Sequence, residues 1–142
     1  MRLSAKPAAL AALALSSAAL GGLPAWAQPD AGQAAETPTV IPVELNEFHY
    51  SPSSIELAAG HSYTLRVTNS GGVAHDLNAK AFFQSVTFAP GSAAKVRDGD
   101  IETAKGQTVD VTFVTGKAGA YDMRCTHPLH AMFGMKGRIV VR

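Results

Sequence analysis

The chain has 142 residues, of which 46% are hydrophobic, 16% are charged and 7% are aromatic. This length allows one domain with a single core and is too short for two. Twelve Lys and Arg side chains stand against eleven Asp and Glu, and this balance argues against a nucleic-acid-binding protein and against a long acidic tail. The chain has one cysteine, Cys125, so an intramolecular disulfide is excluded.

The N-terminal segment has the pattern of an export signal. Arg2 and Lys6 supply positive charge, residues 8–23 form an apolar run, and residues 25–27 are a small-x-small cleavage site. The alternative is an uncleaved membrane anchor, but the run is short for a span of roughly 20 apolar residues and is diluted by Ser and Gly. We therefore expect a Sec-type signal peptide over 1–27, export to the periplasm, and no stable membrane association after cleavage.

The exported part of the chain is dominated by alternation of apolar and polar residues. A lead-in at 28–38, rich in Ala, Gly and Pro, is expected to be flexible and to precede a folded domain over 39–142. Period-two patterns predict four strands, each with one buried face. These strands are expected at 63–68, 108–113, 121–125 and 137–141. With turn residues between them, they predict an all-β protein, either an antiparallel sandwich or a barrel.

One segment, 79–99, departs from this alternation. Residues 79–84 predict a short helix, and the rest of the segment predicts an irregular excursion across one of the sheets. The pattern leaves two roles open for the segment, either a cap over the functional site or a surface for a partner.

A lone cysteine is unusual in an exported protein, because oxidising compartments convert spare thiols into disulfides or sulfenic acids. Three explanations compete for Cys125: intermolecular pairing, burial as an inert thiol, or a thiolate bound to a metal. The sequence supplies partners for the third, since Cys125, His130 and Met135 recur at five-residue steps between two predicted strands. Soft sulfur with imidazole selects copper, and zinc is the weaker alternative because Met is a poor zinc ligand.

The same region resembles a known family when it is combined with two upstream segments. His75-Asp76 follows a Gly-Gly turn, and residues 47–60 have the sequence EFHYSPSSIELAAG. Together with Cys125-x4-His130-x4-Met135, these segments resemble the cupredoxin family, in particular small exported bacterial plastocyanin-like and azurin-like proteins. The resemblance runs from about residue 43 to residue 141, and 79–99 is the part that departs from it.

The resemblance implies a Greek-key β-sandwich with a type 1 copper site at one end. It also implies one copper ion per chain, cycling between Cu(I) and Cu(II). The ligands that it implies are His75, Cys125, His130 and Met135.

Other histidines and methionines compete with these ligands. His127 lies two residues after the cysteine, which leaves little loop to wrap a metal. Met132 falls only two residues after a predicted ligand, so we expect it at the surface. His49 and His61 lie on early strands, and we expect them to be partly exposed and without a metal role.

Two functions fit this ligand set. The first is a one-electron carrier, and the second is a copper protein for storage, delivery or tolerance. The first is favoured because the exported part has no run of surplus Met or His. We expect no enzymatic activity, since the sequence lacks the His-x-His pairs of multicopper enzymes, a second cysteine and hydrolase nucleophile motifs.

Apolar residues around His130 predict a surface for redox partner proteins. They are Pro128, Leu129, Ala131, Met132 and Phe133. The alternative is that these side chains belong to the core. We expect a monomer with no nucleic-acid partner.

Residues next to the ligands are expected to hold the site together. Asp76 and Thr126 each directly follow a predicted ligand, so a hydrogen bond between them would join the two loops. We expect the ring of His130 to reach the surface and to carry electrons to a partner. We expect His75 to be enclosed, with its second ring nitrogen bonded to protein.

Overall fold

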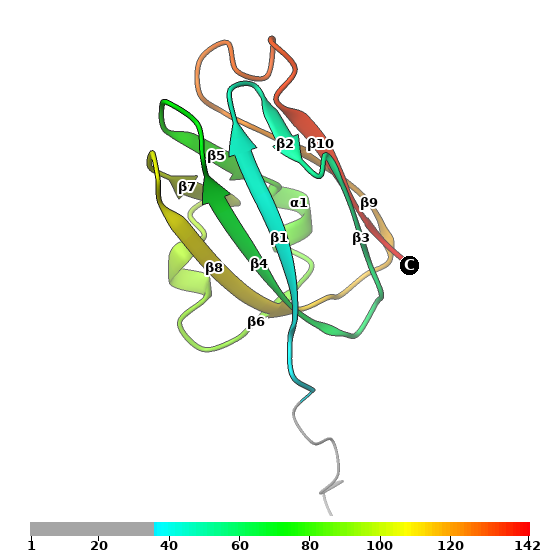
Figure 1. Ribbon diagram of the computed structural model, residues 1–142. Coiled ribbons are helices and arrows are strands. Elements are labelled where there is room, and N and C mark those ends of the chain that lie inside the picture. Colours follow the sequence, from blue (N-terminus) through cyan, green and yellow to red (C-terminus); the bar gives the residue numbers. More distant parts are fainter. Residues whose placement is uncertain (1–35) are drawn as a thin grey trace, which may run out of the picture. The chain divides into compact units, whose positions relative to one another are not determined.

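The computed structural model describes residues 36–142 (Figure 1). The expected signal peptide over 1–27 and most of the lead-in at 28–38 lie outside the described residues. Within 36–142, no helix is both long enough and apolar enough to cross a membrane.

Ten strands of the described chain form two five-stranded sheets. The first sheet has the order β2-β1-β4-β8-β6, with β1 Thr39–Asn46, β2 His49–Ser51, β4 Ser62–Asn69, β6 Thr87–Phe88 and β8 Thr108–Val114. The second sheet has the order β3-β10-β9-β5-β7, with β3 Ser54–Leu57, β5 His75–Asn78, β7 Asp100–Thr103, β9 Gly119–Arg124 and β10 Lys136–Val141. The prediction of an all-β sandwich is confirmed.

Two strand pairs run parallel, whereas alternation alone suggested antiparallel neighbours. β1 pairs with β4 in parallel, and β10 pairs with β3 in parallel. The reason is a crossover, because after β1 and β2 the chain passes to the second sheet as β3 and returns to the first as β4. A parallel pair needs such a connection, since a tight hairpin joins only antiparallel strands.

The core lies between the sheets and is built from alternate residues of each strand. In β4, Leu65 and Val67 are fully buried, while Arg66 between them is exposed and pairs with Asp110 of β8. Burying an apolar side chain of this size contributes roughly 1.5–3 kcal/mol. The alternation read from the sequence is therefore the alternation between core and solvent.

The segment 79–99 contains the short helix α1 (Lys80–Phe83) and the 3-10 helix η1 (Ala93–Lys95), so the predicted helix is confirmed. Phe82 packs edge to face on Phe113 of the first sheet and Tyr121 of the second, with ring centroids 5.2 and 5.6 Å away. β6 pairs with the last residues of β8, at the end of that strand opposite to the connection between β4 and β5. The segment therefore closes a side of the sandwich and does not cap the predicted ligands.

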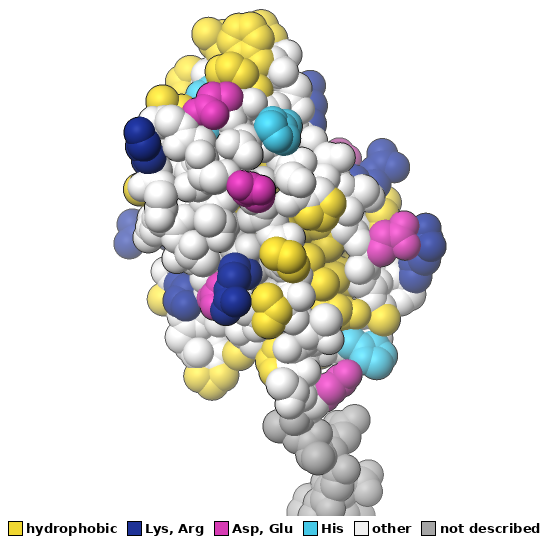
Figure 2. All heavy atoms as spheres, in the orientation of Figure 1, with side chains coloured by type: hydrophobic (Ala, Val, Ile, Leu, Met, Phe, Trp, Pro, Cys, Tyr) yellow, Lys and Arg dark blue, Asp and Glu magenta, His cyan; other side chains and the backbone are white. Residues whose placement is uncertain are grey.

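Three connections meet at one end of the sandwich, at the top of Figure 1. They are the β1–β2 turn, the 70–74 loop between β4 and β5, and the 125–135 loop between β9 and β10. Hydrophobic side chains gather at this end in the space-filling view (Figure 2). All four predicted ligands lie on these connections or at their edges.

Candidate metal centre

His75 is the first residue of β5 and is fully buried. The loop before it is held by Asn69, whose side-chain amide donates to the carbonyls of Val73 and Thr103 at 2.8 and 2.9 Å. The side-chain oxygen of Asn69 accepts the N–H of Gly71 at 2.9 Å. This network determines where β5 begins and so turns the imidazole inward.

The other three predicted ligands lie on residues 125–135, which we call the ligand loop. Cys125 follows β9, and its N–H donates to the carbonyl of Met135, directly before β10, at 3.1 Å. The N–H of Met135 in turn donates to the carbonyl of His130 at 3.0 Å. Gly134 has a φ of 111°, in the left-handed region that favours glycine. The five-residue steps therefore close into a loop whose two ends are pinned together.

Three candidate ligand atoms converge at this end of the sandwich. Nδ1 of His75 lies 3.1 Å from Nδ1 of His130, which lies 3.3 Å from Sγ of Cys125. All three atoms lie within 4.8 Å of one another. The side chains of His75 and Cys125 are fully buried and that of His130 is half-buried, so the structure brings three of the four predicted ligands together.

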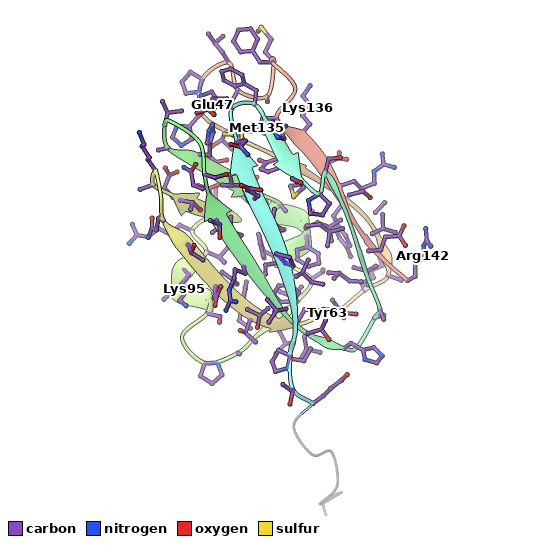
Figure 3. All side chains as sticks on the ribbon, in the orientation of Figure 1. Glu47, Tyr63, Lys95, Met135, Lys136 and Arg142 are labelled. Carbon is purple, nitrogen blue, oxygen red and sulfur yellow. The ribbon has the colours of Figure 1, made fainter. Side chains whose placement is uncertain are left out.

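Met135 is the fourth predicted ligand and is also fully buried. Figure 3 places it at the end of the sandwich that carries the ligand loop, and its backbone bonds that of Cys125. A thioether is a weak ligand at a long distance in a blue-copper site. Coordination by Met135 stays a prediction.

The donor set fits a copper ion. Two imidazole nitrogens facing each other at 3.1 Å need a proton or a cation between them, because an unprotonated Nδ1 is only an acceptor. Burial raises the pKa of the Cys125 thiol to about 11, so a bound cation is needed to keep the thiolate at neutral pH. A single ion that binds both imidazole and thiolate satisfies all three groups, and that combination selects copper.

A pair of hydrogen bonds joins β5 to the ligand loop. The N–H of Thr126 donates to Oδ1 of Asp76 at 2.8 Å, and the Thr126 hydroxyl donates to Oδ2. Asp76 is buried, and its backbone carbonyl accepts the hydroxyl of Tyr50 at 2.8 Å. The predicted bond between Asp76 and Thr126 is confirmed.

Replacing Asp76 with alanine is expected to lower the free energy of unfolding of the metal-free protein by about 1.5–3 kcal/mol, because Thr126 loses a charged acceptor. Copper affinity is expected to fall about 10- to 100-fold, as for other groups that orient metal ligands. Urea unfolding and a competitive chelator titration measure the two effects. The control is Asp122→Ala, an exposed residue of β9, and equal losses in the two variants would contradict the assigned role.

The ring of His127, the competing imidazole, pairs with a carboxylate and is not one of the three converging ligand groups. Its Nε2 lies 3.1 and 3.2 Å from the two carboxylate oxygens of Glu102, and its ring stacks on that of His130 with centroids 5.4 Å apart. It therefore ties the ligand loop to β7. His49 and His61 are exposed, as expected for residues without a metal role.

Three large apolar side chains of the ligand loop are exposed, and we call them the apolar rim. They are Leu129, Met132 and Phe133, with exposed fractions of 58%, 76% and 61%. The alternative that they belong to the core is wrong for these three residues, and the expectation that Met132 lies at the surface is confirmed. The half-buried His130 is thus flanked along its own loop by exposed apolar side chains.

Phe48 is a residue that sequence reasoning missed. Its ring packs edge to face on His130 with centroids 5.2 Å apart and also contacts Phe133 at 5.1 Å. It reaches them from the β1–β2 turn with a φ of 63°. The residue stands in the family-like motif at 47–60, but no local pattern indicates its contact with a ligand 82 positions away in the chain.

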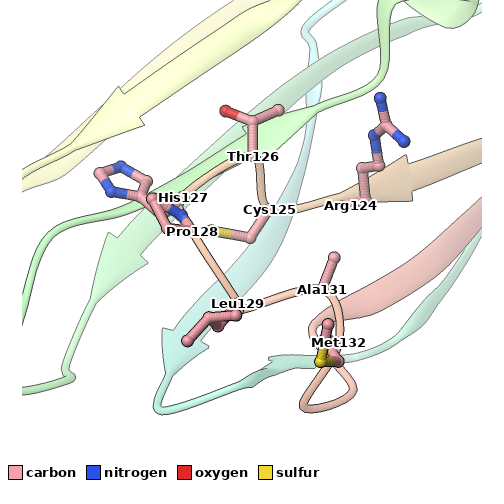
Figure 4. Close-up of a pocket in the computed structure, with 8 residues that line it drawn as sticks. All are labelled: Arg124, Cys125, Thr126, His127, Pro128, Leu129, Ala131 and Met132. Atoms are coloured by element: carbon pink, nitrogen blue, oxygen red, sulfur yellow. The ribbon is translucent and has the colours of Figure 1, made fainter.

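A cavity of about 330 Å³ opens beside the ligand loop (Figure 4). Its lining comes from residues 124–129 together with Ala131 and Met132. Cys125 is among the lining residues although only 1% of its surface is exposed. The thiol therefore lies just beneath the loop surface and is shielded by its neighbours.

The second nitrogen of His75 differs from the expectation. The ring is fully enclosed as predicted, but Nε2 has no hydrogen-bond partner among the described residues. The predicted bond from this nitrogen to protein is wrong for this structure, in which the two nearby oxygens, on Asn69 and Glu47, instead accept the N–H groups of Gly71 and Gly72.

Negative charge gathers on the outer face of the second sheet near the site. Burial, together with the charges of Asp76 and Glu102, raises the pKa of Asp100 to about 6 from its ordinary value of 3.8. The folded protein thus holds this proton more tightly than the unfolded chain. The resulting stability is fully present below pH 3.8 and is lost as the pH rises through about 6.

Replacing Asp100 with asparagine is therefore expected to raise the stability of the protein at neutral pH and to flatten its pH dependence. Urea unfolding from about pH 4 to pH 7 tests this expectation. The exposed Asp122→Asn is the matched control, because it removes the same charge elsewhere on the sheet. If the free energy of unfolding at neutral pH rises equally in both variants, the surroundings of Asp100 do not raise its pKa as described.

The two packed sheets, with two imidazoles and a thiol converging at one end, define a cupredoxin, a small β-sandwich protein that binds copper. A sequence model of the copper binding proteins of the plastocyanin/azurin family matches residues 38–142. The chain belongs to this family, and copper is its cofactor.

This chain is similar in sequence or structure to several named proteins. The copper-resistant cuproprotein CopI of Rubrivivax gelatinosus is 25% identical over 118 residues, which span 78% of this chain and 71% of CopI. Auracyanin from Roseiflexus castenholzii has a similar structure, with a TM-score of 0.55 and 22% identity over 73% of this chain and 97% of that one. Auracyanin A, a "blue" copper protein from Chloroflexus aurantiacus, has a TM-score of 0.53 and 25% identity over 75% of this chain and 100% of its own.

Proposed function

We propose that this protein is a one-electron carrier of the periplasm. The signal peptide expected at 1–27 would direct its export to that compartment. The observation that carries the proposal is the asymmetry of the site. His75, Cys125 and Met135 are fully buried, whereas the ring of His130 is half-buried and flanked by the apolar rim. One ligand therefore connects the enclosed centre to the surface, which suits transfer to a partner that docks there.

The residues of the site would have different roles in such a carrier. The bound ion would supply the Cu(I)/Cu(II) couple. His75, Cys125 and His130 would hold it with Met135 as a weak fourth ligand, and the backbone bonds at the loop ends would keep these ligands in place. The bonds from Thr126 to Asp76 hold the two ligand-bearing segments in register, so little movement would accompany a change of oxidation state.

The proposed partners are redox proteins that dock on the apolar rim. Exposed apolar patches of this kind suit weak and short-lived encounters. The protein is proposed to act as a monomer, without nucleic acid and without a reaction of its own. A single cysteine supports the last point, because a binuclear copper–thiolate centre needs two.

The alternative is a copper protein for storage, delivery or tolerance. Its support is the similarity to CopI, which is named as a copper-resistant cuproprotein. Both functions use the same ligands, so the rates of electron and copper transfer must separate them.

The deciding experiment measures electron self-exchange of the purified protein by NMR line broadening in mixtures of Cu(I) and Cu(II) forms. The same preparation is mixed with a chelator of known affinity to measure how fast copper leaves. Fast self-exchange with slow copper release supports the carrier. Slow self-exchange with rapid release would overturn it in favour of copper handling.

A further inference from the structure

The far nitrogen of His75 is the starting point. Nδ1 of His75 faces the metal centre, so the ring proton must sit on Nε2 when a metal is bound at Nδ1. That nitrogen is buried and has no hydrogen-bond partner among the described residues. Metal-binding histidines almost always donate from the second nitrogen to a carboxylate, a carbonyl or water. A nearby group is therefore needed to receive this N–H.

The surroundings of Nε2 are defined by the missing side chain of Gly71. A Cβ at this position would lie 2.9 Å from Nε2 of His75, 3.0 Å from Oε1 of Glu47 and 3.2 Å from Oδ1 of Asn69. The imidazole nitrogen and two acceptor oxygens thus approach one point, where any residue larger than glycine would push them apart. The two oxygens are the candidates for receiving the N–H.

The two candidate acceptors differ in what they already do. Asn69 holds the loop with all of its amide group, since its oxygen accepts from Gly71 and its nitrogen donates to two carbonyls. Glu47 receives the N–H of Gly72 on Oε1, and this oxygen, like that of Asn69, can accept a second donor. Glu47 is also the charged one, and hydrogen bonds to a charged acceptor are the stronger ones.

The position of Glu47 supports this choice. It lies in the β1–β2 turn, at the same end of the sandwich as Met135 (Figure 3). The bond from the N–H of Gly72 lowers the pKa of Glu47, and the nearby His75 lowers it further. The carboxylate is therefore ionised at neutral pH.

We propose that Glu47 is the positioning residue of His75, and that its carboxylate accepts the Nε2–H of the metal-bound imidazole and favours Cu(II) over Cu(I). The sign follows from charge, because a negative group stabilises the oxidised ion, which carries one more positive charge. The inference rests on the proposed function in one respect, because a change in the copper potential matters most for an electron carrier. The approach of Glu47 Oε1 and His75 Nε2 to one point beside Gly71 is a property of this chain.

The test compares Glu47→Gln with Glu44→Gln by equilibrium redox titration. Glu44 is a matched control, since it loses the same charge, lies three residues earlier near the end of β1 and accepts the hydroxyl of Ser70, which belongs to the same 70–74 loop as Gly72. Glu47→Gln is expected to shift the Cu(II)/Cu(I) equilibrium about tenfold toward Cu(I), an increase of about 59 mV in reduction potential for one electron. Glu44→Gln is expected to shift it much less. Equal shifts in the two variants, or none in Glu47→Gln, would overturn the inference.

A second measurement covers the case in which Glu47→Gln folds poorly. Glu47→Asp keeps the charge but withdraws it from the ring, and an intermediate shift in potential is expected. Hydrogen exchange of the His75 Nε2–H, followed by NMR in the diamagnetic Cu(I) form, is expected to be slow in the unaltered protein and faster in both variants. Exchange that is equally fast in all three proteins would contradict the contact.

These readouts separate the inference from the proposed function. An unaltered protein with fast self-exchange and variants of unchanged potential would leave the carrier standing and remove the role of Glu47. Slow self-exchange with a protected Nε2–H that depends on Glu47 would remove the carrier and keep the positioning residue.

Discussion

Replacing Cys125 with serine is expected to abolish the intense visible absorption of the Cu(II) protein. The thiolate forms the short covalent bond of a blue-copper site, and a hydroxyl oxygen does not replace it. Serine fits the same buried volume and has Nδ1 of His130 nearby as a partner. The free energy of unfolding of the metal-free protein is therefore expected to change by no more than about 2 kcal/mol.

Absorption spectra of the copper-loaded variant and urea unfolding of the metal-free variant measure these effects. Met132→Leu is the control, since it alters another sulfur of the ligand loop that is largely exposed and should leave the spectrum unchanged. A strong visible band that survives in Cys125→Ser would show that the sulfur ligand is assigned wrongly. Loss of the band in Met132→Leu would bring the exposed methionine into the site.

Replacing Leu129 with glutamate is expected to slow electron transfer to a physiological or model partner by about tenfold or more, because a charge on the apolar rim must be desolvated at each encounter. The copper spectrum and the melting temperature are expected to stay nearly unchanged, since this side chain is 58% exposed. The residue has a φ of 68°, and leucine and glutamate tolerate that conformation about equally. Stopped-flow kinetics at several ionic strengths measure the effect.

Val114→Glu is a matched control for this experiment. It places the same charge on an exposed apolar position of β8, away from the ligand loop. If electron transfer slows equally in both variants, the effect comes from the change in net charge. The apolar rim is then not the docking surface. A collapsed melting curve in Leu129→Glu alone would mean that the side chain supports the fold of the loop.

The sequence by itself determined the fold class and the chemistry of the ligand loop. Alternation in segments such as 63–68 and 108–113 reports one-sided burial directly, because successive side chains of a strand point to opposite faces. Cys125, His130 and Met135 lie within one short loop, so their spacing alone indicates that they can surround one point. The hydrogen bond between Asp76 and Thr126 was also predictable, since each residue directly follows a ligand and therefore lies close to the metal centre.

Only the tertiary structure decided which distant groups complete the site. His75, Phe48 and Glu47 come from other connections, and their meeting with the ligand loop depends on the crossover that makes β1 and β4 parallel neighbours. The orientation of His127 toward Glu102 was equally hidden, because it depends on how β7 pairs with β5. Local patterns record which face of a strand is buried, whereas contacts between loops arise only when the two sheets pack and bring their ends together.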